Sequence, residues 1–205
     1  MSSDNKRILV LISGNGSNLQ AILDATQSKT ISKGEVIGVI SNRKNAYGLT
    51  RAQNFNIPTK VHNLKAYKDS GKTRIEYDID LAKHCLEFTP NLIVLAGFMH
   101  VLSPEFLNQI PQGVPIINLH PALPGQFDGA HAIDRAFTAF QQGLIKETGI
   151  MVHYVISEVD RGEPILTKTI PIEEGDSLET LETRIHSHEH ELIVKAVNLV
   201  LEKLN

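Results

Sequence analysis

The segment from residue 114 to residue 125, VPIINLHPALPG, is an apolar run that ends in two polar side chains and two prolines. On a strand, Asn118 and His120 point to the same face because side chains alternate with a period of two, and Pro121 cannot continue the pairing. An amide and an imidazole at one strand end could bind an oxyanion or move a proton. The alternative role for His120 is that of a hydrogen-bonded core histidine.

A carboxylate partner for His120 would hold the ring in one tautomer and favour its charged form. Asp160, in the segment SEVDRGEP (157–164), is the candidate for this partner. An aspartate in front of Arg-Gly is also typical of a turn, so a purely local role for Asp160 stays open. The sequence alone does not bring the two side chains together.

The glycine-rich segment SGNGSN (13–18) joins an apolar run to a helical pattern. Free N–H groups and the helix dipole at such a junction favour an anion, and phosphate is the natural guest. The alternative is a tight turn at Gly14 and Gly16, with Ser17 as the N-cap and Gln20 completing a capping box. Both interpretations can hold together.

A nicotinamide dinucleotide is disfavoured at this segment. The pattern G-x-G-x-x-Leu19 lacks the third glycine, and Ser41-Asn42-Arg43 stands where an acid would bind the ribose. Only Arg43 leaves room for the phosphorylated form of that cofactor, and no Gly-Lys-Ser/Thr of a Walker loop follows.

The sequence does not favour other catalytic arrangements. No G-x-S-x-G nucleophile elbow occurs. His186 and His190 in HSHEH (186–190) have a spacing that could hold zinc, but a second ligand cluster and the H-E-x-x-H pattern are both missing, so we expect no metal site.

The elements that must position these residues alternate along the chain. Helical patterns follow the first apolar run and precede the third, where Thr73 and Glu76 form a capping-box pattern, and a final helix is entered through Asp176-x-x-Glu179. This order predicts an α/β fold, with a single domain over residues 1–205 and a doubly wound, mostly parallel sheet covered by helices on both faces. The predicted strands are 7–13, 35–41, 91–97, 115–120, 149–156 and 164–172.

Composition narrows the function classes. The chain of 205 residues is 41% hydrophobic and carries a net charge of −3 without a basic stripe, which disfavours nucleic acid as a partner. Its single cysteine, Cys85, excludes an internal disulfide and fits a buried thiol in a reducing compartment. No apolar run is long enough for a signal peptide or a membrane span, so we expect a soluble, cytoplasmic protein.

Four segments together resemble the glycinamide ribonucleotide formyltransferase family, which uses folate in purine synthesis. They are VLISGNGSNLQAI (10–22), VLAGFMHVLSP (94–104), INLHPALPG (117–125) and VHYVISEVDRGEPI (152–165), and the likeness covers nearly the whole chain. Other enzymes that use 10-formyltetrahydrofolate share the HPALP element. The first loop and the chain length therefore decide for this family over formyltransferases and deformylases with an additional domain.

The resemblance implies a role for each matching position. It implies a phosphate- and nucleotide-binding half over about 1–100 and a folate-binding, catalytic half over about 101–205. The substrate phosphate would bind at Asn15, Gly16, Ser17 and Asn18. His186 and Glu189 would lie on the glycinamide and ribose side. The positions that match folate contacts are Arg74, Met99, His100, Val101, Leu102, Asn118, Val155, Ile156 and Val159.

Asn118, His120 and Asp160 match the catalytic trio of the family. The resemblance implies attack of the glycinamide amine on the formyl carbon of 10-formyltetrahydrofolate, without a metal and with small-molecule substrates only. Protonated His120 and the amide would stabilise the oxyanion, and Asp160 would raise the pKa of His120. The chain would act as a monomer or homodimer. A 10-formyltetrahydrofolate hydrolase and a non-catalytic module that binds phosphoribosyl ligands are the alternatives.

Three features depart from bacterial members of this family. His100 stands where some have arginine, and Met151 where serine or threonine is frequent. The segment LPGQFDGAHA (123–132) replaces a Lys-Tyr-Pro-Gly type of segment and is similar to the fungal form. These changes concern folate contacts and loop shape more than the trio.

Overall fold

The fold is built on one mixed β-sheet. A computed structural model describes residues 5–204, and its strands lie in the order β3-β2-β1-β4-β5-β6-β7. The pairs from β3 to β5 are parallel, whereas β6 is antiparallel to β5 and β7 is antiparallel to β6. The strands are β1 (Lys6–Ile12), β2 (Gly34–Ser41), β3 (Thr59–Val61), β4 (Leu92–Leu95), β5 (Ile116–His120), β6 (Glu147–Tyr154) and β7 (Pro164–Pro171).

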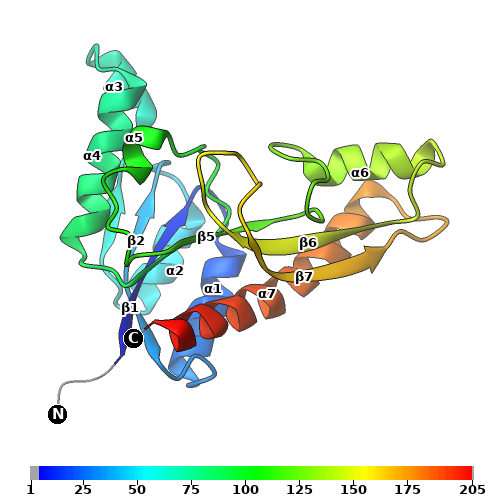
Figure 1. The fold of residues 1–205 in the computed structure, drawn as a ribbon, viewed down its shortest axis with the longest axis horizontal. Helices are drawn as coiled ribbons and strands as arrows, with labels where there is room; N and C mark the ends of the chain where they lie inside the picture. Colours follow the sequence, from blue (N-terminus) through cyan, green and yellow to red (C-terminus); the bar gives the residue numbers. More distant parts are fainter. Residues whose placement is uncertain (1–4, 205) are drawn as a thin grey trace.

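Helices cover both faces of the sheet (Figure 1). Helices α1, α2 and α7 pack on one face and α4 and α5 on the other, while β6, β7, α6 and the beginning of α7 extend to one side as an arm. The helices are α1 (Ser17–Gln27), α2 (Tyr47–Asn54), α3 (Leu64–Asp69), α4 (Arg74–Glu87), α5 (Pro104–Leu107), α6 (Ala132–Gln141) and α7 (Leu178–Lys203).

Strand β1 is apolar from Ile8 to Ile12, where helices cover both of its faces. Ile8, Val10 and Ile12 point into the core beneath α1 and α7, and Leu9 and Leu11 point into the core beneath α4. All five side chains are fully buried. A parallel strand with helices on both faces needs apolar residues at every position, because neither face meets water.

The predicted α/β architecture is confirmed. Each of the six predicted strands is present, with ends within a few residues of those expected. The sequence analysis did not anticipate α2, β3, α3, α5 or α6. None of the helices formed by residues 5–204 has both the length and the apolar character of a transmembrane span.

The direction of the sheet order reverses between β1 and β4, and ligands of open α/β sheets bind at such a point. The loops that follow these two strands are joined there. The N–H of Ser13 donates to the carbonyl of Gly97 over 3.1 Å, and the N–H of Met99 donates to the Ser13 hydroxyl over 2.7 Å. The glycine-rich loop and the segment 99–102 therefore lie side by side.

Strand β5 ends where the sequence predicts. His120 pairs with Met151 of the antiparallel strand β6, and Pro121 follows directly. The chain then leaves the sheet, forms α6 and returns as β6 and β7, whose connection 155–163 comes back to the end of β5. The antiparallel pair thus returns a loop to the same sheet edge without a crossover helix.

Two predicted helix caps were wrong. Helix α1 is capped by Gly16 with a left-handed backbone, and Ser17 is the first helical residue and makes no side-chain cap. Helix α7 begins after Ser177, whose capping box is completed by Thr180 and not by the expected Asp176 and Glu179. In each case the actual cap lies one residue from the predicted one.

Asp176 instead anchors the start of α7 through an ion pair. Its two carboxylate oxygens each lie 2.7 Å from a guanidinium nitrogen of Arg184, and the pair lowers the pKa of Asp176 to about 2. The folded-state pKa lies below the unfolded one, so the contribution to stability is present above pH about 4 and is lost as the pH falls toward about 2.

We expect Asp176→Asn to flatten the acid dependence of stability. Urea unfolding at a series of pH values should show a smaller loss of unfolding free energy between pH about 4 and about 2 than in the unmodified chain. Glu174→Gln, an exposed change in the same loop, is the matched control. Equal slopes for the Asp176 variant and the unmodified chain would contradict this role.

Candidate functional site

The glycine-rich loop leaves the first turn of α1 open to a ligand. Gly16 caps the helix with φ of 76°, and no side chain caps it. Its carbonyl accepts from the N–H of Gln20 over 2.9 Å, whereas the N–H groups of the residues before Gln20 have no helical acceptor. These groups and the helix dipole together suit a phosphate.

Helix α2, which the sequence analysis did not predict, is hydrogen-bonded to this loop. The N–H of Gly48 donates to the carbonyl of Gly14 over 3.1 Å. Arg51 donates to the carbonyl and the side-chain oxygen of Asn15, each over 2.9 Å, and to the amide oxygen of Gln20 over 3.1 Å. Arg51 thus fixes the loop, and also brings a positive charge to it.

Asn18 and Glu189, far apart in sequence, meet beside the loop. The Asn18 amide donates to the Glu189 carboxylate over 3.0 Å, and both side chains are buried. The amide oxygen of Asn18 is buried and has no hydrogen-bond partner. His186 lies one helical turn before Glu189 on α7 and is exposed. Residues expected on the phosphate side and on the glycinamide side are therefore neighbours.

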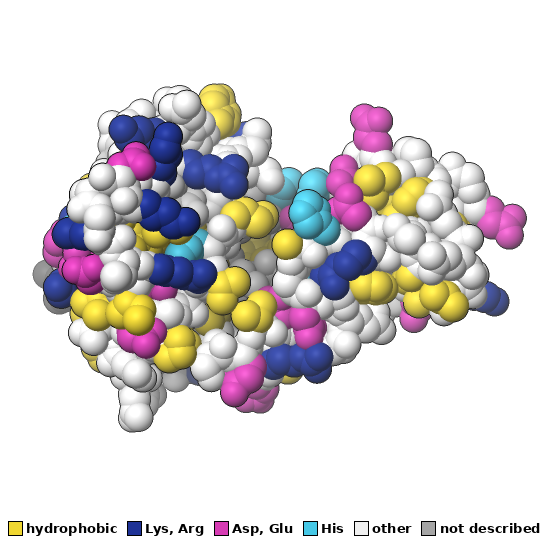
Figure 2. Space-filling model, turned by 90° about the horizontal axis from the view of Figure 1, so that it is seen from above, with side chains coloured by type: hydrophobic (Ala, Val, Ile, Leu, Met, Phe, Trp, Pro, Cys, Tyr) yellow, Lys and Arg dark blue, Asp and Glu magenta, His cyan; other side chains and the backbone are white. Residues whose placement is uncertain are grey.

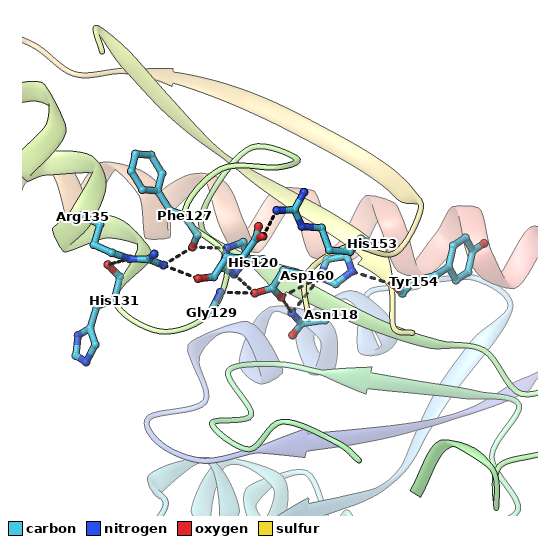
Figure 3. Close-up of polar contacts among 11 residues, drawn as sticks. Asn118, His120, Phe127, Gly129, His131, Arg135, His153, Tyr154 and Asp160 are labelled. Carbon is cyan, nitrogen blue, oxygen red and sulfur yellow. Dashed lines mark hydrogen bonds and ion pairs between the residues drawn. The ribbon is translucent and has the colours of Figure 1, made fainter. Parts of the chain in front are cut away.

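The structure brings Asn118, His120 and Asp160 together (Figure 3). The Asp160 carboxylate lies 3.4 Å from Nδ1 of His120 through one oxygen and 3.4 Å from the Asn118 amide nitrogen through the other. The N–H of Gly129 donates to it over 2.7 Å. The His120 and Asp160 side chains are only 6% and 8% exposed, so their charges interact with little screening by water.

His153 belongs to the same network, and sequence reasoning missed it. Its Nδ1 lies 2.9 Å from the Tyr154 carbonyl, which can only accept, so Nδ1 carries the proton. Nε2 lies 3.2 Å from the Asn118 amide nitrogen and 3.4 Å from the Asp160 carboxylate. His153 stands opposite Asn118 in the register of β5 and β6. That register, which sequence patterns do not reveal, is the signal that would have identified it.

Opposing influences act on His120. Its Nε2 lies 3.2 Å from the Phe127 carbonyl and its Nδ1 faces Asp160, so only the doubly protonated ring satisfies both acceptors. Burial nevertheless dominates and lowers the pKa of His120 below its usual value, while Asp160 and the Phe127 carbonyl act to raise it. The expected direction of the Asp160 effect is confirmed, although burial outweighs it in the net pKa of His120.

Asp160 is held in its charged form. Burial acts to raise the pKa of Asp160, but the neighbouring His153 ring, the hydrogen bond from the Gly129 N–H and the nearby His120 ring hold that pKa below its usual range. Asp160 also has a left-handed backbone with φ of 56°, which is strained for a residue other than glycine.

The segment 99–102 is fixed by a buried carboxylate on α4. Asp78 is bound by Nε2 of His100 over 2.5 Å and by the N–H of Ser103 over 3.2 Å. Burial opposes ionisation of Asp78, yet these hydrogen bonds hold its pKa below the usual value. Arg74 donates to the Val101 carbonyl over 2.5 Å and approaches Asp78.

Apolar side chains stay exposed near these loops. Met99 is 71% exposed and Val101 51%, and Ile156 and Val159 of the 155–163 loop are exposed too, whereas Leu102 is buried. Figure 2 shows hydrophobic and histidine side chains around a hollow in the middle of the face seen from above. Exposed apolar side chains around a concavity fit an aromatic ligand.

Within residues 5–204, no group of three or more His, Cys, Asp or Glu side chains could hold a metal ion. The histidines of HSHEH have other surroundings. His188 lies 2.9 Å from the Lys168 amine, and Nε2 of His190 is buried without a hydrogen-bond partner.

The chain is similar to known proteins over nearly its whole length. The sequence profile of the family described as Formyl transferase matches residues 6–197. The chain is 52% identical to phosphoribosylglycinamide formyltransferase of Schizosaccharomyces pombe over 95% of this chain and 96% of that protein. It is 50% identical to the Dictyostelium discoideum protein of the same name, over 96% of this chain and 98% of that protein.

A solved structure shows the same fold. Glycinamide ribonucleotide transformylase 1 from Symbiobacterium toebii superposes with a TM-score of 0.88 at 37% identity, over 98% of this chain and 90% of that chain.

The role of the glycine-rich loop can be tested at Gly16. A Cβ there would lie 2.7 Å from the Gly48 Cα, and the left-handed backbone disfavours any side chain, so Gly16→Ala should distort the loop. We expect the affinity for ribose 5-phosphate to fall at least about tenfold by calorimetry. Gly14→Ala is the matched control, because its Cβ would meet nothing within 4 Å.

Thermal unfolding of the Gly16 variant should accompany the titration. A folded Gly16→Ala protein with unchanged affinity would show that the phosphate binds elsewhere.

Proposed function

The chain belongs to the formyl transferases, and within them to the phosphoribosylglycinamide formyltransferases; from this premise we propose that it transfers a formyl group to the amine of glycinamide ribonucleotide in purine biosynthesis. The observation that carries the proposal is the convergence of Asn118, His120 and Asp160 at the sheet edge that also carries the open terminus of α1. The formyl donor is 10-formyltetrahydrofolate.

Each substrate has a region of fitting chemistry. The ribonucleotide phosphate binds at Asn15 to Asn18, and the buried Glu189 carboxylate faces the glycinamide side together with His186. The folate occupies the apolar hollow beside Met99 to Leu102, between Arg74 and the loop that carries Val155, Ile156 and Val159. We therefore divide the single domain into a nucleotide-binding half and a folate-binding half.

The reaction forms one bond and breaks another at the formyl carbon. The amine nitrogen of the ribonucleotide attacks the formyl carbon, and the carbonyl oxygen becomes an oxyanion. The tetrahedral intermediate then breaks its bond to N10 of the folate. The Asn118 amide and the His120 ring donate hydrogen bonds to the oxyanion, which gains charge only as the reaction proceeds.

His120 also moves the proton that the amine loses. Its lowered pKa leaves the ring neutral near pH 7, so it can accept this proton, directly or through water. The resulting imidazolium is paired with Asp160 through Nδ1, and its Nε2–H, which faces the Phe127 carbonyl, is shared with the oxyanion. The same proton then passes to N10 as the folate leaves, so the ring returns to its neutral form.

His120→Ala should leave a folded protein in which formyl transfer falls at least about a hundredfold. The assay follows the absorbance change when the folate loses its formyl group, with and without the ribonucleotide. His131→Asn is the matched control, because that side chain is 80% exposed and asparagine tolerates its left-handed backbone.

Three outcomes of this assay separate the function classes. A signal that requires the ribonucleotide supports formyl transfer. Release of formate without the ribonucleotide would indicate a hydrolase. Silence in both tubes, from folded protein that binds ribose 5-phosphate, would indicate a binding module.

Asp160→Asn should lower the rate and shift its acid limb. Removing the carboxylate takes away the strongest influence that raises the pKa of His120, so that pKa falls further. Since neutral His120 accepts the proton, the rate should then decline at a lower pH than in the unmodified enzyme. The substrate amine ionises identically in both assays. An unmoved acid limb would argue against the pairing of Asp160 with His120.

A further inference from the structure

Residues 127–129 contact both members of the His120–Asp160 pair. The Phe127 carbonyl lies 3.2 Å from Nε2 of His120, and the Gly129 N–H donates to Asp160 over 2.7 Å. These residues belong to 123–132, the segment that departs from the bacterial pattern.

The residue between them, Asp128, binds the neighbour of Asp160 in sequence. Its carboxylate lies 2.6 Å from the guanidinium of Arg161. On the other side, Arg135 of α6 donates to the carbonyls of Phe127 and Asp128 over 2.5 Å and 2.7 Å. The 123–132 segment is therefore tied both to α6 and to the loop that carries Asp160.

We propose that Asp128 and Arg161 are positioning residues, whose ion pair joins the two loops and holds the Asp160 carboxylate against His120 during formyl transfer. The inference rests on the proposed function. It gives the 123–132 segment a role in the reaction. Neither Asp128 nor Arg161 contacts the reacting atoms, so both residues act through Asp160.

Backbone strain explains why such a tie is needed. Phe127 and Asp160 both have left-handed backbones, with φ of 48° and 56°. Gly129, whose N–H donates to Asp160, has φ of 80°. Non-glycine residues keep this conformation only where surrounding contacts enforce it. The hydrogen bond from the Gly129 N–H fixes one carboxylate oxygen of Asp160. The Asp128–Arg161 ion pair fixes the backbone next to Asp160.

Asp128 also acts on His120 through its charge. The titratable groups that influence His120 are Asp160 and Asp128, which favour the imidazolium, and His153, which opposes it. One oxygen of Asp128 is buried and has no hydrogen-bond partner, so Arg161 engages only part of the carboxylate. The ion pair therefore sets how much of this negative charge His120 experiences.

The experiment compares Asp128→Asn, Arg161→Gln and the double variant in the formyl-transfer assay. We expect each single change to lower kcat about threefold to tenfold with both KM values nearly unchanged, because positioning affects the reacting geometry. The double variant should be no slower than the worse single variant, since the two residues act as a unit. Arg161→Lys should recover most of kcat.

The pH profile separates positioning with charge control from simple loosening of a loop. Loss of the Asp128 charge should lower the pKa of His120 and move the acid limb of kcat to lower pH. Loss of Arg161 keeps the Asp128 charge and removes a positive charge beside Asp160, so the acid limb of this variant should lie at higher pH than that of Asp128→Asn. A loosened loop alone would move the limb equally in both variants.

Lys195→Gln breaks an exposed ion pair on α7 and is the matched control. Additive losses in the double variant, equal shifts of the acid limb, or unchanged kcat in a protein whose unmodified form transfers formyl would each overturn this inference. Absence of transfer by the unmodified protein would instead overturn the proposed function.

Discussion

The carboxylate of Asp160 is charged and almost completely removed from water, and the architecture around the end of β5 serves to keep it so. A buried charge without partners costs several kcal/mol, so its neighbours must supply donors in a fixed arrangement. A backbone N–H, an amide and the His120 imidazole do this, and the His153 ring lies beside them. They come from β5, β6 and the loop that contains Gly129, which explains why the antiparallel strands are required beside an otherwise parallel sheet.

The same burial sets the behaviour of the neighbouring imidazole. His120 is surrounded by acceptors that suit its charged form, yet burial excludes the water that would stabilise that form and so lowers the pKa of the ring. The ring is thus balanced between two protonation states by effects of opposite sign. Such a balance suits a group that must both take up and release a proton within one reaction cycle.

The sequence predicts the residues that carry the chemistry better than it predicts the residues that position them. The end of β5 at Pro121 and the apolar strands follow from local patterns. The place of His153 depends on the register of two antiparallel strands, and that of Arg51 on a short helix that the sequence analysis did not predict. The pKa of His120 depends on how much water the assembled site excludes, which no local sequence pattern measures.

Helix α7 contributes to both halves of the molecule. Its buried residues pack against α1 on one side and against α6, β6 and β7 on the other, and Glu189 meets Asn18. In chain order it follows every strand of the sheet. On a ribosome, the strands would therefore emerge well before the helix that covers their shared face. Until α7 emerges, the part of this face that α1 and α2 do not cover stays exposed, a state in which aggregation competes with folding.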